Sequence, residues 1–172
     1  MATLGTDKFI NSRPLVFLTV GAASLLVLLG AYGLQLFAKL PPCILCIYQR
    51  VPYVTTITLC LLGLTLCKQN KLPRLSNSIL GGCTATLFVG GCLAFYHLGV
   101  EQQLWQGTAG CSAQGIDALT ISELRESILS APAADCGNII WSFLGLSLAA
   151  WNLICSATLA LLSAYALKQW AK

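Results

Sequence analysis

Four long stretches without a charged side chain constrain this chain more than any other feature. They cover positions 14–38, 51–67, 75–100 and 136–167. About 20 apolar residues cross the ~30 Å hydrocarbon core of a bilayer, and in lipid the crossing segment must be helical to satisfy its own backbone groups. We therefore expect an all-α integral membrane protein, in which residues 1–172 form a single four-transmembrane-helix bundle.

The composition supports this prediction. Charged residues make up 9% of the chain and hydrophobic residues 56%, whereas a soluble domain carries about 25% charge. Such a chain cannot cover a globule with polar surface. This excludes an ordinary soluble domain, a disordered tail and a nucleic-acid binder, in spite of the formal net charge of +4.

The second uncharged stretch is the shortest, so its helix is expected to begin upstream, near Cys43, and to contain Arg50. The first stretch is longer than the apolar core of a secretory signal and is interpreted as an uncleaved anchor. The predicted spans are about 15–37, 44–67, 76–97 and 139–166, with a long outer loop over about 98–138.

Charge asymmetry predicts the orientation in the membrane. With four spans, both termini and the loop between the second and third helices share one side. That side carries seven basic residues and one acidic one: Lys8, Arg13, Lys68, Lys71, Arg74, Lys168 and Lys172, with Asp7. Because basic residues concentrate on the cytoplasmic side, both termini are expected to be cytoplasmic.

The long outer loop contains one helix signal. Thr120 and Glu123 have capping-box spacing, and Ile121, Leu124 and Ile128 then fall on one helical face. We expect a short amphipathic helix here, lying on the membrane surface or packed on the end of the bundle.

The topology sorts the nine cysteines into two groups. Five lie within spans and are expected to be small apolar packing residues: Cys60, Cys67, Cys83, Cys92 and Cys155. The other four are Cys43, Cys46, Cys111 and Cys136 at the outer side. An outer compartment opposite the cytoplasm is oxidising, so disulfides are expected among these four.

Cys43 and Cys46 form a C-x-x-C pair, which closes too short a loop to stabilise a fold and is typical of a redox-active dithiol. The preceding Pro41-Pro42 predicts that the second helix begins at the thiols. The partial positive charge of a helix N-terminus favours a thiolate there.

Two further side chains are candidates for binding an electron acceptor. Arg50 falls four residues after Cys46 and seven after Cys43, so a continuous helix would place it on the face of both sulfurs. There it could lower a thiol pKa and hold an anionic or carbonyl-bearing acceptor. His97, the single histidine, is expected at a similar depth on the third helix. Pro52 predicts a kink that opens space beside Arg50.

Cys111 and Cys136 bracket the predicted loop helix. They are either a structural staple or a carrier that soluble protein can reach, since a loop is more accessible than a site at the membrane surface. Beside the C-x-x-C pair, this arrangement indicates a relay.

These residues resemble a known family, the bacterial disulfide-bond formation protein B (DsbB) family. The resemblance rests on Pro42-Cys43-Ile44-Leu45-Cys46-Ile47-Tyr48-Gln49-Arg50, Tyr96-His97, Cys111, Cys136 and Trp141-Ser142-Phe143-Leu144-Gly145-Leu146. It implies a quinone-dependent thiol oxidase of the bacterial inner membrane, using ubiquinone or menaquinone. Its implied partner is a periplasmic thioredoxin-fold dithiol oxidase, DsbA.

The resemblance also implies residue roles. The partner thiolate would attack Cys111, with Cys136 as the alternative. The Cys111–Cys136 pair would be reoxidised by Cys43 and Cys46, and Cys46 would pass electrons to quinone. Arg50 and His97 would bind the quinone. Gln49 stands where some members carry an acidic residue, so no proton acceptor is assigned there.

Three alternatives remain from the sequence. One is a thiol enzyme of the vitamin K epoxide reductase type, which shares the C-x-x-C chemistry. Another is a structural four-span protein whose outer disulfides brace the loops. In the third, the four outer cysteines bind zinc or copper, although structural zinc sites usually show two closely spaced ligand pairs.

Overall fold

The computed structural model describes residues 10, 12–69, 73–108, 111, 135–139 and 141–170. Its main elements are four long apolar helices, so the protein is a multi-pass membrane protein as predicted. Their bounds, in chain order, are α2 (Arg13–Phe37), α3 (Ile44–Tyr48) continued by α4 (Arg50–Gln69), α5 (Pro73–Glu101) and α7 (Leu148–Trp170). The predicted amphipathic helix at 120–128 lies outside the described residues.

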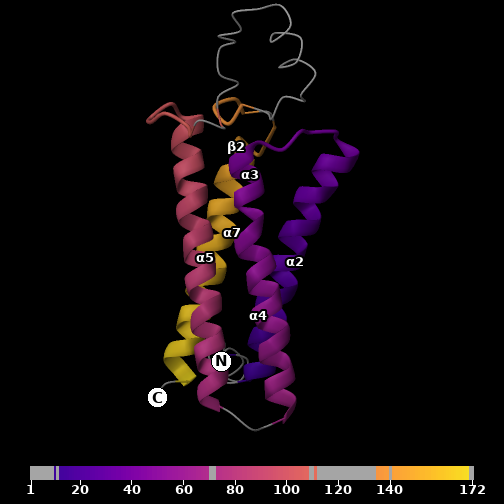
Figure 1. Cartoon of the computed structure of the whole chain (residues 1–172), viewed down its shortest axis with the longest axis vertical. Helices are drawn as coiled ribbons and strands as arrows, with labels where there is room; N and C mark the ends of the chain where they lie inside the picture. Colours follow the sequence, from indigo (N-terminus) through magenta and orange to yellow (C-terminus); the bar gives the residue numbers. More distant parts are fainter. Residues whose placement is uncertain are drawn as a thin grey trace, which may run out of the picture.

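The long helices run along one axis, with α4 packed between α2 and α5, and α5 packed on α7 (Figure 1). The start of α2 and the end of α7 meet at one end of the bundle. There the indole nitrogen of Trp170 donates to the carbonyl of Ile10 at 2.7 Å, and the Arg13 guanidinium lies 5.2 Å from the Trp170 ring. The short elements α3 and β2 lie at the opposite end.

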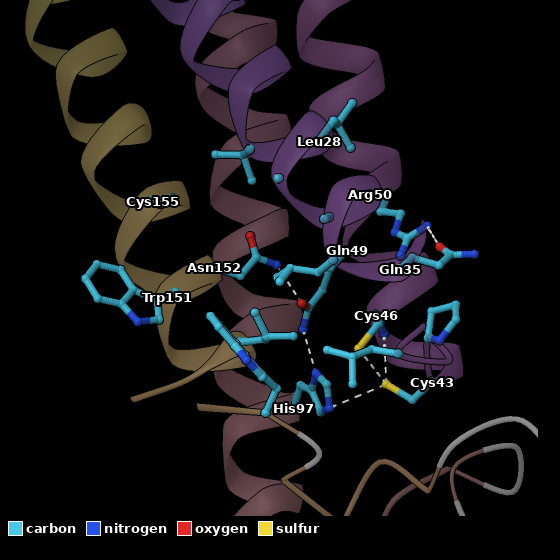
Figure 2. A pocket seen from close by; sticks show the side chains of 18 of the residues that line it. Leu28, Gln35, Cys43, Cys46, Gln49, Arg50, His97, Trp151, Asn152 and Cys155 are labelled. Carbon is cyan, nitrogen blue, oxygen red and sulfur yellow. Dashed lines mark hydrogen bonds between the residues drawn. The ribbon is translucent and has the colours of Figure 1, made fainter. Parts of the chain in front are cut away.

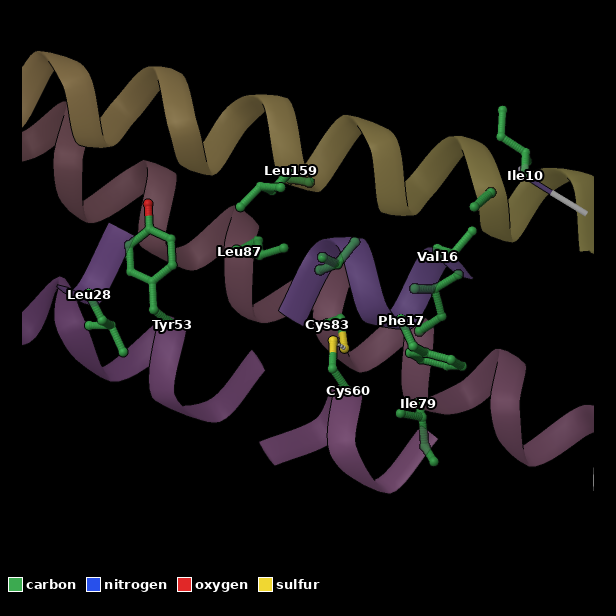
Figure 3. Packing of buried hydrophobic residues seen from close by; sticks show 14 residues of the cluster. Ile10, Val16, Phe17, Leu28, Tyr53, Cys60, Ile79, Cys83, Leu87 and Leu159 are labelled. Carbon is green, nitrogen blue, oxygen red and sulfur yellow. Dashed lines mark hydrogen bonds between the residues drawn. The ribbon is translucent and has the colours of Figure 1, made fainter. Parts of the chain in front are cut away.

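The bundle core is built from close contacts between helices (Figure 3). Phe17 of α2 is fully buried, and a Cβ added at Gly63 of α4 would lie 2.6 Å from its ring. Small residues at helix interfaces allow such close approach in membranes. Large apolar side chains such as Leu18, Phe88 and Leu161 point outward instead, as a lipid-facing surface requires.

The membrane cysteines only partly follow the expected packing role. Cys60 and Cys83 are buried in the core with their sulfurs 3.8 Å apart. Cys67 packs against this core, whereas Cys92 is exposed on the bundle surface. Cys155 lines a cavity near the outer end.

The second span is broken at Gln49, between α3 and α4. Pro52 explains the break, because it has no N–H to donate to the carbonyl four residues earlier. Gln49 keeps helical backbone angles, φ −67° and ψ −17°, so the interruption is confined to this one residue.

The last span starts later than the predicted residue 139. Ser142–Phe143 (β1) and Leu146–Ser147 (β2) pair as an antiparallel hairpin, and α7 begins only at Leu148. Leu144 and Gly145 form the turn with φ of 53° and 78°, the positive values of a tight two-residue hairpin. The hairpin is apolar and uncharged, so hydropathy alone extends the span through it.

The third helix also differs from its predicted end at residue 97, because α5 continues to Glu101. This extra turn places the Glu101 carboxylate one turn beyond His97, with 3.9 Å between Oε1 and Nε2. Ser147, which caps α7 by accepting from the amide of Ala150, donates its hydroxyl to Glu101.

Candidate active site

Cys43 and Cys46 lie at the start of the second span. Cys43 is the N-cap of α3, and its sulfur accepts the backbone N–H of Cys46 at 3.2 Å, confirming that this helix begins at the thiols. The two sulfurs are 2.7 Å apart. Since a disulfide bond is about 2.05 Å long, the pair can close with little backbone movement.

His97 of α5 lies against Cys43. Its Nε2 is 3.6 Å from the Cys43 sulfur, and both side chains are almost fully buried. The pKa of Cys43 is lowered from 9.0 to about 5, chiefly by the hydrogen bond from the Cys46 thiol and then by the hydrogen bond with His97, against the opposing effect of burial. In the reduced pair these contacts favour the thiolate of Cys43.

Arg50 contacts α2. Its Nη1 donates to Gln35 Oε1 at 2.9 Å (Figure 2), and its Cζ lies 4.5 Å from the centroid of the Tyr32 ring. Arg50 lines one cavity with both sulfurs of the C-x-x-C pair, but the groups that lower the pKa of Cys43 are Cys46 and His97.

The loop cysteines come to the same place. Cys111 and Cys136 form a disulfide with 5.0 Å between their Cα atoms, and both are buried beside Cys43, Leu45 and Val100. The sulfurs of Cys43 and Cys136 and a ring nitrogen of His97 all lie within 4.8 Å of one another. The sulfur of Cys136 is bonded to Cys111, so it lacks the thiolate charge of a metal ligand, and the arrangement is suited to disulfide exchange.

A cavity of about 300 Å³ opens beside the C-x-x-C pair. Its apolar wall includes Leu26, Val27 and Leu34 of α2 and Leu148 of α7. Its polar wall is formed by Cys46, Gln49, Arg50, His97 and Asn152. Arg50, Cys46 and His97 thus line one cavity. His97 also contacts the Cys43 sulfur through Nε2.

Sequence reasoning missed two amides in this wall. Gln49 Nε2 lies 3.1 Å from His97 Nδ1, and Asn152 Nδ2 donates to Gln49 Oε1 at 2.6 Å (Figure 2). Asn152 in turn accepts from the hydroxyl of Tyr53. Strongly polar side chains inside an apolar span are costly and often functional, so Asn152 carried a usable signal.

Comparisons with known proteins agree with this site. The family model described as disulfide bond formation protein DsbB matches residues 12–166. A disulfide bond formation protein B of Xanthomonas campestris is 31% identical over 139 residues, covering 79% of each chain. One from Polaromonas naphthalenivorans is 29% identical over 153 residues, covering 87% of this chain and 86% of its own.

An uncharacterized protein of Rickettsia prowazekii is 31% identical over 147 residues, covering 81% of this chain and 77% of its own. No solved structure matches the chain.

Proposed function

The chain belongs to the disulfide bond formation protein DsbB family, and from this premise we propose that it is a quinone-dependent thiol oxidase that reoxidises a periplasmic, thioredoxin-fold, DsbA-like dithiol oxidase. The observation that carries the proposal is the placement of the Cys136 and Cys43 sulfurs within 4.8 Å of each other. At this separation a thiolate of the reduced loop pair can attack the Cys43–Cys46 disulfide directly.

The first exchange occurs at the loop disulfide. A partner thiolate attacks Cys111, and Cys136 leaves as a thiolate. The second partner thiolate then attacks the first partner sulfur, which forms the partner disulfide and releases Cys111. Cys111 lines a second cavity of about 370 Å³, whose described wall also includes Trp105 and Asp135, and this supports Cys111 as the sulfur that meets the partner.

The second exchange transfers the electrons inward. The Cys136 thiolate attacks Cys43 in the Cys43–Cys46 disulfide, and Cys46 leaves as a thiolate. Cys111 then attacks Cys136, which restores the loop disulfide and releases Cys43. A thiol with a low pKa is a good leaving group, so the pKa of about 5 for Cys43 favours this step.

The cavity fits a quinone head. It combines an apolar wall with Cys46 and the ring of His97, and it presents the guanidinium donors of Arg50, which suit carbonyl oxygens. Bound ubiquinone or menaquinone would accept the two electrons of the Cys43–Cys46 pair and the one proton of the Cys46 thiol as the disulfide re-forms, and a second proton from water would complete the quinol. Arg50, held by Gln35, would hold the quinone in place, and His97 would orient it while donating to Cys43.

The inner membrane of a bacterium is the proposed location, with the cysteine site facing the periplasm. The basic residues Arg13, Lys68, Arg74 and Lys168 lie at or near the helix ends away from this site. The positive-inside rule then makes that end cytoplasmic.

The test is stopped-flow absorbance of purified protein in detergent, mixed with a reduced thioredoxin-fold dithiol and with or without ubiquinone. We expect quinone reduction by the native protein, loss of this reduction in Cys46→Ser, and native rates in Cys92→Ser, which alters an exposed cysteine of the bundle surface. If native protein reduces no quinone with any dithiol, the oxidase proposal is wrong and the cysteines act as structural braces.

A further inference from the structure

A chain of hydrogen bonds connects three helices to Cys43. The Tyr53 hydroxyl of α4 donates to Asn152 Oδ1 of α7, and Asn152 Nδ2 donates to Gln49 Oε1 at 2.6 Å. Gln49 Nε2 lies 3.1 Å from His97 Nδ1, and His97 Nε2 lies 3.6 Å from the Cys43 sulfur. The proposed reaction uses only His97 and Cys43. It gives no role to the amides of Gln49 and Asn152.

A contact with the backbone of Leu93 orients the Gln49 amide. The same Nε2 atom lies 3.5 Å from the backbone carbonyl of Leu93. A carbonyl oxygen only accepts hydrogen bonds, so the group that faces it must be the NH₂. Reversing the amide would set its oxygen against the Leu93 carbonyl oxygen.

The amide orientation decides which nitrogen of His97 carries the proton. Because the Gln49 NH₂ donates to Nδ1, a proton on Nδ1 would place two donors against each other. On the other side of the ring, Nε2 faces two acceptors, the Cys43 sulfur and the Glu101 carboxylate at 3.9 Å. A neutral histidine has one donor and one acceptor nitrogen, set by the hydrogen bond of the other.

We infer that Gln49 is a positioning residue that holds neutral His97 in its Nε2–H tautomer, so that the ring donates to the Cys43 sulfur. This inference rests on the proposed function and explains why a glutamine lies beside the C-x-x-C pair. A carboxylate at position 49 would draw the proton to Nδ1. The amide keeps it on the side of Cys43, where it stabilises the thiolate that leaves in the second exchange.

The charged and titratable groups around His97 do not reverse this assignment. Cys46 and Glu101 lie on the Nε2 side, and Glu101 as an acceptor favours the same tautomer. Arg50 and Asp135 line the same cavity, with Arg50 bonded to Gln35. Tyr53 stands at the far end of the chain of bonds and reaches His97 only through the two amides.

The experiment is ¹⁵N NMR of protein labelled only at histidine, purified in detergent and stripped of quinone. The chain has one histidine, so both ring signals belong to His97. At a pH at which the spectrum shows a neutral ring, we expect a protonated Nε2 and an unprotonated Nδ1. A protonated Nδ1 in the native protein overturns the inference, whatever the behaviour of any variant.

Two variants test the role of Gln49 itself. In Gln49→Glu, a carboxylate replaces the donor and we expect the proton to appear on Nδ1. In Gln35→Glu, the matched change at the other cavity glutamine, we expect the native tautomer. An unprotonated Nδ1 in folded Gln49→Glu overturns the assignment. If Gln49→Glu does not fold, Gln49→Leu takes its place and is expected to lose the single tautomer, whereas a retained single Nε2–H tautomer would refute the role.

The measurement needs neither quinone nor partner, so it separates the two proposals. The Nε2–H tautomer without quinone reduction would refute the oxidase and leave the positioning role intact. Quinone reduction together with a protonated Nδ1 would support the oxidase and refute the positioning role of Gln49.

Discussion

Replacing His97 by leucine should raise the pKa of Cys43. In the native protein this pKa is lowered to about 5, and His97 contributes a hydrogen bond to the Cys43 sulfur. A hydrogen bond to a charged group is worth about 1.5–3 kcal/mol, and one pKa unit corresponds to about 1.4 kcal/mol. We therefore expect the Cys43 pKa of His97→Leu to rise by about one to two units, with the hydrogen bonds from Cys46 retained.

The assay is the rate of iodoacetamide modification of Cys43 against pH, measured on its peptide by mass spectrometry. Both proteins carry Cys46→Ser, which prevents oxidation of Cys43 and keeps a hydroxyl donor in place of the thiol. The midpoint of the pH profile is the informative quantity. A thiolate of higher pKa is intrinsically more nucleophilic, with a Brønsted coefficient of about 0.4–0.5, so rates at one pH partly compensate.

The control is Tyr96→Phe, which removes a hydroxyl that donates to the Gln106 carbonyl at 2.9 Å and leaves the ring next to His97 in place. The midpoint of its pH profile should equal that of the protein that carries Cys46→Ser alone. A midpoint in His97→Leu that also equals the reference would show that His97 does not stabilise the Cys43 thiolate, and the electrostatic reasoning would fail.

Three further predictions follow from the same structure. Cys43 is already ionised above pH 5, so the reduced Cys43–Cys46 pair carries one thiol proton there. The reduction potential of the pair should therefore fall by about 30 mV per pH unit above pH 5 and by about 59 mV per pH unit below it. A single slope through pH 5 in a direct potential titration would contradict the low pKa. Arg50→Gln should raise the KM for ubiquinone while leaving exchange between the two disulfides at the native rate in a quinone-free single turnover; an unchanged KM would remove Arg50 from the quinone site. Gly63→Ala should destabilise the bundle by about 1–3 kcal/mol, because its new Cβ would lie 2.6 Å from a buried aromatic ring of α2. Gly33→Ala, which has open space around it, should not destabilise the bundle. Equal thermal unfolding temperatures of the two variants would refute the packing argument.

The cysteine site shows where local sequence reasoning succeeds. The start of α3 at Cys43 follows from the prolines before it and from the thiol that caps it, and these are neighbours in the chain. Arg50 shows the limit of the same reasoning. Its place on the second span follows from the local sequence, but its partner Gln35 lies on another helix, which the local pattern does not identify.

The hairpin before α7 shows a second limit. Hydropathy cannot distinguish an apolar hairpin at the membrane boundary from the first turns of a helix, because both lack charge. The hairpin depends on positive φ at Leu144 and Gly145 and on the cap that Ser147 gives to α7. Only the second of the two turn residues is a glycine, so the turn signal was weak.

The sequence by itself determined the four spans, their relative orientation and the redox pair at a helix start, because these depend on the local pattern of apolar, charged and cysteine residues. Only the tertiary structure decided that His97 contacts Cys43 across 54 positions, that Gln49 meets Asn152 across 103, and that Cys136 lies beside Cys43. Those contacts depend on how the helices pack side by side, and the hydrophobic pattern that buries each helix does not specify which polar side chains will meet.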